Sequence, residues 1–337
     1  MIAMKRKVLI TGAAGFIGSR LAEHLHVLGF EVVGCDIYNF RNLFFDVGDS
    51  NHLFVQKLRC DRIAQFLHKN QIQYHAVDLS DYAAVSKLFS NVKPDAVVHL
   101  AAQAGVRHSV KAPMDFVKSN LNGFANVLDA CRNHAIEDFL YASSSSVYGA
   151  RTTAPFSEKD RCDTPESFYA ATKIANELMA QSYYSQYKTT SLGMRFFTVY
   201  GPWGRPDMAP MIFAQKMRQR QPIQLFGNGV LKRDFTFVAD TVYAIAQLLE
   251  RGASRHRADV VNIGHSEPIQ VTDFVATLSQ CLGVEPIVEL APMQTSDVPL
   301  TCASDEKLVK LIGEWPHTTL KEGLTKMTQW LEKWQIV

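Results

Sequence analysis

Short apolar runs alternate with amphipathic stretches of helical period along residues 7–197. After the first run, for example, apolar side chains recur every three or four positions, at Ile17, Leu21, Leu25 and Leu28. Helices that alternate with strands carry the chain back across a sheet, so the pattern predicts an α/β fold with a doubly wound parallel sheet. The predicted strands are 8–10, 31–36, 73–77, 95–100, 138–142 and 190–197.

The second half of the chain has shorter and more mixed elements. The pattern predicts a helix at 211–219, a strand at 222–226, a segment at 232–238 that crosses back, a helix at 240–250 and a strand at 260–263. An amphipathic helix at 320–334 follows near the C-terminus. We therefore expect a large domain of residues 1–197 with about 235–262, and a second, smaller α/β domain of 198–234 with about 263–337.

Glycines at positions 12, 15 and 18 separate the first predicted strand from the first predicted helix. Gly12 would allow a sharp turn, Gly15 would let a pyrophosphate approach the backbone, and Gly18 would let the helix pack closely on the strand. The helix N-terminus would then offer N–H groups to that pyrophosphate. The GxxGxxG spacing differs from the common GxGxxG, and an ordinary tight turn is the alternative. The strand, turn and helix together nevertheless predict a dinucleotide-binding Rossmann domain.

An acid ends the second predicted strand at Asp36, about twenty residues past the glycines. A carboxylate at this place accepts a hydrogen bond from a ribose 2′-hydroxyl and repels a 2′-phosphate. The expected cofactor is therefore NAD. Arg41 lies close enough in sequence to leave NADP open.

Other candidate cofactor residues follow the later strands. Asp78 could accept from an adenine amino group or cap the helix that begins near Tyr82. Small residues at 101–105 would let a flat cofactor lie on the backbone. Ser119 and Asn120 could face the cofactor or point to solvent.

Candidate catalytic residues follow the fifth predicted strand, which ends in four serines at 143–146. Tyr169 and Lys173 lie one helical turn apart and share a face of the next helix. A phenol with a pKa of about 10 is a poor base at neutral pH. A neighbouring ammonium and an oxidised nicotinamide both favour the phenolate, so Tyr169 could take a proton from an alcohol while its hydride passes to NAD. Ser144 would hold the same oxygen; a purely structural role for all three is the alternative.

Composition and charge limit the classes of binding partner that we expect. The chain of 337 residues has a net charge of +2 and scattered basic residues, so no nucleic-acid partner is expected. It shows no apolar stretch of bilayer length and no signal peptide, so no membrane partner is expected. The six cysteines stand singly without metal-ligand spacing. We expect reduced thiols, no metal and a cytoplasmic location.

The segment 37–51 carries Phe40, Leu43, Phe44 and Phe45 among residues that are typical of loops. Loops of this length are often functional, so it could be a lid or a contact with a partner subunit. A plain surface insertion is equally compatible with the sequence.

These motifs together resemble the extended short-chain dehydrogenase/reductase family over essentially the whole chain. The marks are Gly12-Ala-Ala-Gly-Phe-Ile-Gly18, Asp78-Leu79, His99-Leu-Ala-Ala, Tyr169-xxx-Lys173 and Arg233-Asp234-Phe. Within that family, the stretches 101–107, 143–149 and 195–208 are similar to members that invert C4 of UDP-glucuronate. The resemblance implies an NAD-dependent isomerase that forms UDP-galacturonate through a transient 4-keto sugar.

The resemblance also implies roles for individual residues. Arg233 would meet the substrate diphosphate, Asp297 the uridine ribose, and residues 224–226 the uracil. A homodimer through helices near 114–134 and 169–187 is implied as well. The implied catalytic residues are Ser144, Tyr169 and Lys173. The implied cofactor residues are Gly12, Gly15, Phe16, Ile17, Gly18, Asp36, Asp78, Leu79, Leu100, Ala101, Ala102, Gln103, Ser119, Tyr169 and Lys173. The implied substrate residues are Ser144, Ser145, Ser146, Thr198, Arg205, Gln224, Phe226, Arg233 and Asp297.

Three other functions stay open. A UDP-glucuronate decarboxylase shares the first oxidation, but Ser145, Ser146 and Thr198 offer hydrogen bonds that would hold the carboxylate, and Arg205 could add charge. A UDP-glucose or UDP-galactose 4-epimerase is the second alternative. The third is a non-catalytic NAD-binding scaffold or redox sensor. A 4,6-dehydratase is disfavoured because serines occupy the places where its catalytic acids are expected.

Overall fold

The computed structural model describes residues 6–37, 57–294 and 297–334. Its centre is a seven-stranded sheet in the order β10-β6-β5-β4-β1-β2-β3, and all its pairs are parallel. The strands are β1 (Lys7–Thr11), β2 (Glu31–Asp36), β3 (Gln73–Ala76), β4 (Ala96–His99), β5 (Asp138–Ser144), β6 (Ser191–Phe196) and β10 (Ala258–Ile263). The predicted doubly wound Rossmann fold is confirmed.

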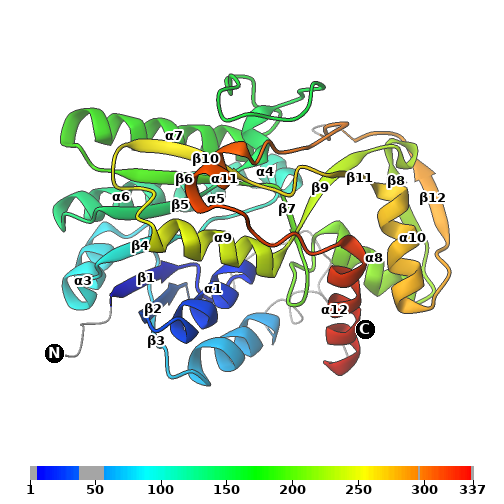
Figure 1. Ribbon diagram of the computed structural model, residues 1–337, viewed down its shortest axis with the longest axis horizontal. Coiled ribbons are helices and arrows are strands. Elements are labelled where there is room, and N and C mark those ends of the chain that lie inside the picture. The colour runs from blue at the N-terminus through cyan, green and yellow to red at the C-terminus, as the bar shows by residue number, and fades with distance from the viewer. Residues whose placement is uncertain (1–5, 38–56, 295–296, 335–337) are drawn as a thin grey trace.

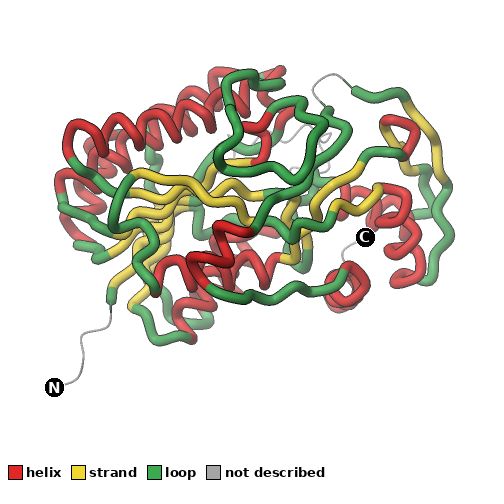
Figure 2. The backbone as a smooth tube through the Cα atoms, turned by 45° about the horizontal axis from the view of Figure 1, so that its top comes forward, coloured by secondary structure: helices red, strands yellow, loops and turns green. Residues whose placement is uncertain are grey.

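Helices cover both faces of this sheet (Figures 1 and 2). One layer contains α1 (Phe16–Val27) and α9 (Val238–Glu250), and the other contains α3 (Tyr82–Val92), α6 (Gly123–Asn133) and α7 (Phe168–Tyr187). Side chains of consecutive β1 residues point to opposite faces of the sheet. Val8 and Ile10 therefore lie in one apolar core and Leu9 lies in the other. Strands buried on both faces explain the continuous apolar runs in the sequence.

Smaller sheets lie at one end of the molecule, at the right of Figure 1. A three-stranded sheet has the order β11-β9-β7, and a parallel pair joins β12 to β8. Their elements are β7 (Thr198–Tyr200), α8 (Ala209–Arg218), β8 (Ile223–Phe226), β9 (Lys232–Phe237), β11 (Pro268–Gln270), α10 (Val271–Leu282), β12 (Val288–Ala291), α11 (Glu306–Ile312) and α12 (Leu320–Lys333). Most of these elements lie in the ranges 198–234 and 263–337, where we expect the smaller α/β domain.

Several boundaries differ from the prediction. The helix predicted at 114–134 consists of α5 (Pro113–Phe116), a π-helical turn (Val117–Asn122) and α6, and α4 (Val106–Lys111) precedes it. Residues 57–62 are helical and continue into a π-helical turn at Ile63–His68. The stretch after 197 begins with β7, a short strand that the sequence pattern did not predict. Most of the 37–51 segment, including Arg41, lies outside the described residues.

None of the helices in the described ranges is both long enough and apolar enough to cross a membrane.

Candidate functional site

The glycine turn lies where β1 ends and α1 begins. Gly12 has a φ of +73°, and a Cβ there would lie 2.7 Å from the backbone nitrogen of Ala101, at the end of β4. A Cβ on Gly18 would overlap the carbonyl oxygen of Gly12. The sharp turn and the close packing of helix on strand are therefore confirmed. Gly15 is the N-cap residue of α1, and no side chain among the described residues caps this helix. The positive end of the helix is therefore open to an anion.

Asp36 is buried at the end of β2, beside the glycine turn. One carboxylate oxygen accepts from the backbone nitrogen of Ala14 at 3.0 Å, and the other accepts from that of Ile37 at 2.8 Å. The Nη1 atom of Arg59 lies 3.4 Å from the second oxygen. The acid therefore points along the edge of the glycine turn, as a ribose acceptor must.

Gln103 and Asn120 form a buried polar link beyond β4. The Asn120 side chain accepts from the Gln103 backbone nitrogen at 2.8 Å and donates to the Gln103 carbonyl oxygen at 2.9 Å. Ser119 Oγ accepts from the same nitrogen at 3.1 Å. The solvent-side alternative is therefore wrong for Asn120. The Gln103 Nε2 atom is buried without a hydrogen-bond partner in the described parts of the chain.

Asp78 does not cap α3. The capping residue is Asp81, whose side chain accepts from Ala84 N at 3.1 Å. Asp78 instead accepts from the backbone and hydroxyl of Ser80, and its second oxygen lies 2.9 Å from the Lys118 Nζ. Two acids precede α3, and the turn geometry gives the cap to the later one.

Ser144, Tyr169 and Lys173 meet at the carboxyl end of β5. Tyr169 is hydrogen-bonded to Ser144, and the Lys173 Nζ lies 5.9 Å from the centroid of the tyrosine ring. The same Nζ donates to the Ala142 carbonyl oxygen at 2.8 Å. Ser167 caps the helix through Ala170 N at 3.1 Å, which fixes where the first turn of α7 begins. The structure therefore brings these three residues together.

The protonation balance of the pair is set mainly by burial. Burial raises the pKa of the Tyr169 phenol, while the hydrogen bond with Ser144 and the charge of Arg205 act in the opposite direction. Burial lowers the pKa of the Lys173 ammonium to about 8, and Glu177 opposes that shift. The chain alone therefore keeps Tyr169 protonated, and formation of the phenolate requires further positive charge.

The remaining serines differ in environment. Ser143 is buried and donates to the Glu177 carboxylate at 2.6 Å, so it belongs to the structural network beneath the site. Ser146 donates to the Ser144 hydroxyl at 3.0 Å, and its backbone nitrogen lies 3.2 Å from the same oxygen. Ser145 and Thr198 are half-buried, and Thr198 follows the strand that pairs with β5. The structure therefore brings the Ser146 hydroxyl directly against that of Ser144.

Arg205 approaches the same place from the loop after β7. Its guanidinium forms two hydrogen bonds with Asp207, at 3.1 Å and 2.5 Å, and one with the Ala104 carbonyl oxygen at 3.3 Å. Burial acts to lower the pKa of Arg205, but Asp207 outweighs it and keeps the side chain charged. A fixed cation therefore faces Tyr169.

A second cluster contains the other predicted substrate residues. The Arg107 guanidinium of α4 lies 5.0 Å from the centroid of the Phe226 ring and 3.8 Å from Asp297. Burial lowers the pKa of Arg233, Asp297 raises it and Arg107 lowers it, so these three charges are neighbours. Gln224, on β8, is exposed. Sequence reasoning missed Arg107, because only the tertiary fold brings α4 to β8.

Arg62 was also missed. It is buried, and its Nη2 donates to the carbonyl oxygens of Trp203 at 2.5 Å and Gly204 at 3.3 Å. Its Nη1 lies 3.4 Å from the Ala14 carbonyl oxygen in the glycine turn. Burial lowers its pKa to about 9. Arg62 thus links the glycine turn to the loop that carries Arg205, and no local sequence signal marks it.

The remaining predicted cofactor residues line the same edge. Leu79 is buried below the Asp78 turn, and Leu100, Ala101 and Ala102 follow β4 against Gly12. Phe16 and Ile17 open α1. A glycine cradle, an open helix N-terminus, an acid at the β2 end and an unpaired amide at Gln103 suit a dinucleotide.

Comparisons with known proteins agree with this geometry. Residues 8–264 match the family described as the NAD dependent epimerase/dehydratase family. The chain is 41% identical over 339 residues to Protein CapI of Staphylococcus aureus, covering 96% of this chain and 98% of that protein. It is 38% identical over 345 residues to a probable UDP-glucuronate 4-epimerase of Rhizobium meliloti, covering 97% of each. A crystal structure of a UDP-glucuronic acid 4-epimerase from Bacillus cereus, in complex with UDP-glucuronic acid and NAD, superimposes with a TM-score of 0.86 at 29% identity; the match covers 97% of this chain and 99% of that one.

Proposed function

The chain belongs to the NAD dependent epimerase/dehydratase family, and on that premise we propose that it inverts C4 of UDP-glucuronate to give UDP-galacturonate. The observation that carries this proposal is the convergence of Ser144, Tyr169 and Lys173 beside the glycine turn. The similarity to the Rhizobium meliloti and Bacillus cereus proteins is the basis for proposing glucuronate as the sugar of the substrate.

Tyr169 acts as the base and then as the acid. Its oxygen takes the proton from the sugar 4-hydroxyl and later returns one to the alkoxide of the inverted centre. Ser144 donates to the same substrate oxygen and keeps it near the phenol. Lys173 supplies the positive charge that favours the phenolate. NAD, when bound, would supply reversible hydride transfer at C4, and return of the hydride to the opposite face of the sugar would consume no external oxidant.

Retention of the carboxylate distinguishes this reaction from decarboxylation. The 4-keto form of glucuronate is a β-keto acid, and it loses carbon dioxide fastest when the C5–carboxylate bond stands perpendicular to the carbonyl plane. Ser145, Ser146 and Thr198 offer short donors that hold the carboxylate away from that alignment, and Arg205 adds charge. Each hydrogen bond to an ionised group contributes roughly 1.5–3 kcal/mol, which is enough to select one conformer.

The nucleotide anchors the substrate while the flat 4-keto sugar turns over. We assign this anchoring to the smaller domain, which we take to comprise 198–234 with about 263–337, while 1–197 with about 235–262 hold the cofactor. Arg233 would bind the diphosphate, Asp297 the ribose hydroxyls, and Gln224 and Phe226 the uracil. The proximity of Arg233, Asp297 and Phe226 to Arg107 supports this assignment.

The test is to incubate the purified protein with UDP-glucuronate, without added cofactor, and to follow the sugar by proton NMR. Formation of UDP-galacturonate is expected. A UDP-pentose would instead identify a decarboxylase. Turnover of uncharged UDP-hexoses alone would identify a UDP-glucose or UDP-galactose 4-epimerase, and no turnover with added NAD would favour a scaffold. Replacement of Tyr169 by Phe should abolish turnover and leave NAD bound.

We also propose that the protein is a homodimer through the helices near 114–134, which begin with α5 and end with α6, and near 169–187, which is α7. Large apolar side chains are exposed on these helices, including Met114 at 70% and Leu178 at 59% exposure. A charged residue at Leu178 should convert a dimer into a monomer in light scattering. A wild-type monomer would refute the proposal.

A further inference from the structure

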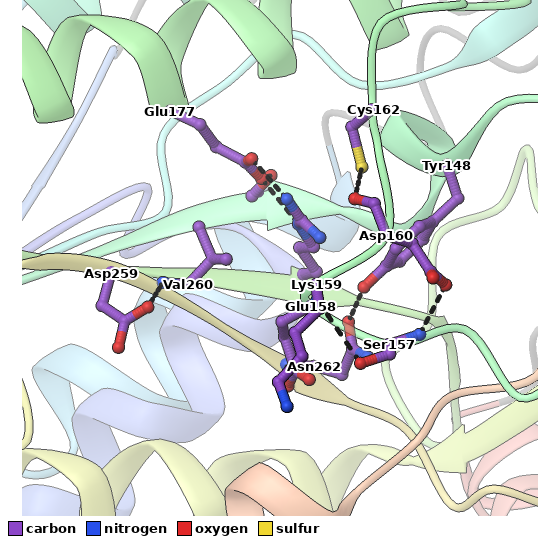
Figure 3. A network of polar contacts seen from close by, with 12 residues as sticks. Tyr148, Ser157, Glu158, Lys159, Asp160, Cys162, Glu177, Asp259, Val260 and Asn262 are labelled. Atoms are coloured by element: carbon purple, nitrogen blue, oxygen red, sulfur yellow. Dashed lines mark hydrogen bonds and ion pairs between the residues drawn. The ribbon is translucent and has the colours of Figure 1, made fainter.

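Glu177 lies one helical turn beyond Lys173, so Tyr169, Lys173 and Glu177 recur every four residues along one stripe of α7. Glu177 is only 7% exposed and has no direct part in the proton transfers proposed above. Its carboxylate, labelled in Figure 3, accepts three hydrogen bonds. They come from Ser143 Oγ at 2.6 Å, from Arg195 Nε at 2.9 Å and from Arg195 Nη2 at 2.7 Å. Three donors fix both oxygens of this acid.

The elements that hold Glu177 also build the catalytic edge. Ser143 precedes Ser144 on β5 and pairs in register with Arg195 on β6. The Arg195 guanidinium lies 4.8 Å from the centroid of the Tyr148 ring, and the Tyr148 hydroxyl donates to Asn262 at 2.6 Å. The side chains of Arg195 and Glu177 are 5% and 8% exposed. A buried ion pair is weak support for stability, because desolvation offsets its attraction. Stability alone therefore does not explain why the Arg195–Glu177 ion pair is buried beside the catalytic edge.

The charge of Lys173 supplies that reason. Its ammonium is buried at 3% exposure, and Glu177 opposes the effect of burial on it. His99 faces Lys173 from β4, but burial and Lys173 lower the pKa of His99 to about 3, so it carries no charge at neutral pH. Tyr169 faces Lys173 from its own helix. Among the described residues around Lys173, Glu177 is the acid that supports its charge.

Besides the cations Lys173 and Arg195, two further titratable groups lie around Glu177, and both are uncharged at neutral pH. Burial raises the pKa of Tyr141 on β5 well above its ordinary value, and burial also raises the pKa of Cys162 in the loop before α7. Arg195 is the cation that shares the carboxylate with Lys173. Substitution of Glu177 therefore changes the balance of charge at Lys173, and no second acid among the described residues is in place to compensate.

We propose that Glu177 is a positioning residue of the reaction: fixed by Ser143 and Arg195, its carboxylate keeps the Lys173 side chain charged and in place beside Tyr169. The inference rests on the proposed function, because it takes Tyr169 and Lys173 as the reacting pair. It assigns to an acid remote from the substrate a control over the pH range in which the enzyme works.

The test compares Glu177→Gln and Glu177→Asp across pH. Gln keeps the shape and can still accept from Ser143, but it removes the charge. The alkaline limb of kcat should move to lower pH by about one unit in Glu177→Gln, the lower end of the effect of one close opposite charge, because Arg195 shares the carboxylate. The KM for the UDP-sugar should stay unchanged. Glu177→Asp keeps the charge and should keep the wild-type limb.

Asp138→Asn is the matched control. Asp138 is a buried acid on the same strand β5, at its opposite end, and it pairs with Arg6 and Arg255. This variant should lower the melting temperature and leave the pH limb where it is. An unchanged limb in Glu177→Gln, or an equal shift in Asp138→Asn, would overturn the proposal.

A readout independent of turnover separates this inference from the proposed function. NMR titration of protein labelled at lysine Cε, with the Lys173 signal assigned by Lys173→Met, reports the charge of that lysine directly. Its midpoint should fall in Glu177→Gln even if UDP-glucuronate is not a substrate. A midpoint equal to that of the wild type would refute the role of Glu177, whatever the enzyme turns over.

Discussion

His99 makes the stability of this protein sensitive to mild acid. The imidazole lies on β4 at 4% exposure and packs against the rings of Phe124 and Phe139, at centroid distances of 5.7 Å and 6.5 Å. Its Nδ1 lies 2.8 Å from the Thr11 hydroxyl. Burial, with the charge of Lys173, lowers the pKa of His99 to about 3. The folded protein therefore holds a neutral ring at neutral and mildly acidic pH.

The direction and size of the effect follow from linkage. Between pH 6.5 and about 3 the unfolded chain binds a proton at His99 and the folded chain does not. The free energy of unfolding therefore falls as the pH falls through this window, by about 1.4 kcal/mol for each unit. From pH 7 to pH 5 the loss from this one residue is about 2 kcal/mol.

The assay is urea unfolding, followed by circular dichroism at pH 7, 6 and 5, for the wild type and His99→Asn. Asn keeps a polar atom near the place of Nδ1 for Thr11 but cannot titrate in this range. His99→Asn should be less stable at pH 7 because its aromatic contacts are lost, yet it should lose about 2 kcal/mol less than the wild type on acidification. His26→Asn, at an exposed position on α1, is the control and should follow the wild type. Equal acid losses in the wild type and His99→Asn would refute the reasoning.

Three further predictions concern the turn, the carboxylate and the loop. Gly18→Ala should give protein that neither melts cooperatively nor retains NAD, because a Cβ there overlaps the Gly12 carbonyl oxygen; a wild-type NAD content after purification would contradict this. Thr198→Val should raise the share of UDP-pentose in the NMR product ratio about tenfold, since one hydrogen bond to the carboxylate is lost; an unchanged ratio would exclude Thr198 from that contact. Arg62→Met should lower the free energy of unfolding by about 1–3 kcal/mol in urea, because the Trp203 carbonyl oxygen loses its donor; an unchanged midpoint would show that water replaces it.

Local pattern was sufficient for the main sheet and for part of the site. The apolar runs that became β1, β2, β4, β5 and β6 are recognisable because both faces of those strands are buried. Tyr169 and Lys173 could be paired from sequence because an interval of four residues places two side chains on one helix face. Glu177 lies at the next interval along the same stripe and could have been found by the same rule.

Local pattern failed where two signals compete or where the partner is remote. Asp78 and Asp81 both suit the start of α3, and only the turn geometry selects Asp81. Asn120 looks like a surface residue, but its amide is buried against the backbone of Gln103. The short strand β7 reads as a loop because its pairing with β9 lies outside its own sequence.

The sequence by itself determined the element types, the glycine turn and the stripe on α7, because periodicity and backbone sterics act between residues that are neighbours along the chain. Only the tertiary structure decided that Arg62 joins the glycine turn to Trp203, that Arg107 reaches Phe226 and that Arg195 fixes Glu177. These contacts join elements far apart in sequence. Their energies depend on burial and on the distance between charges, and neither exists until the sheet and its helices have packed.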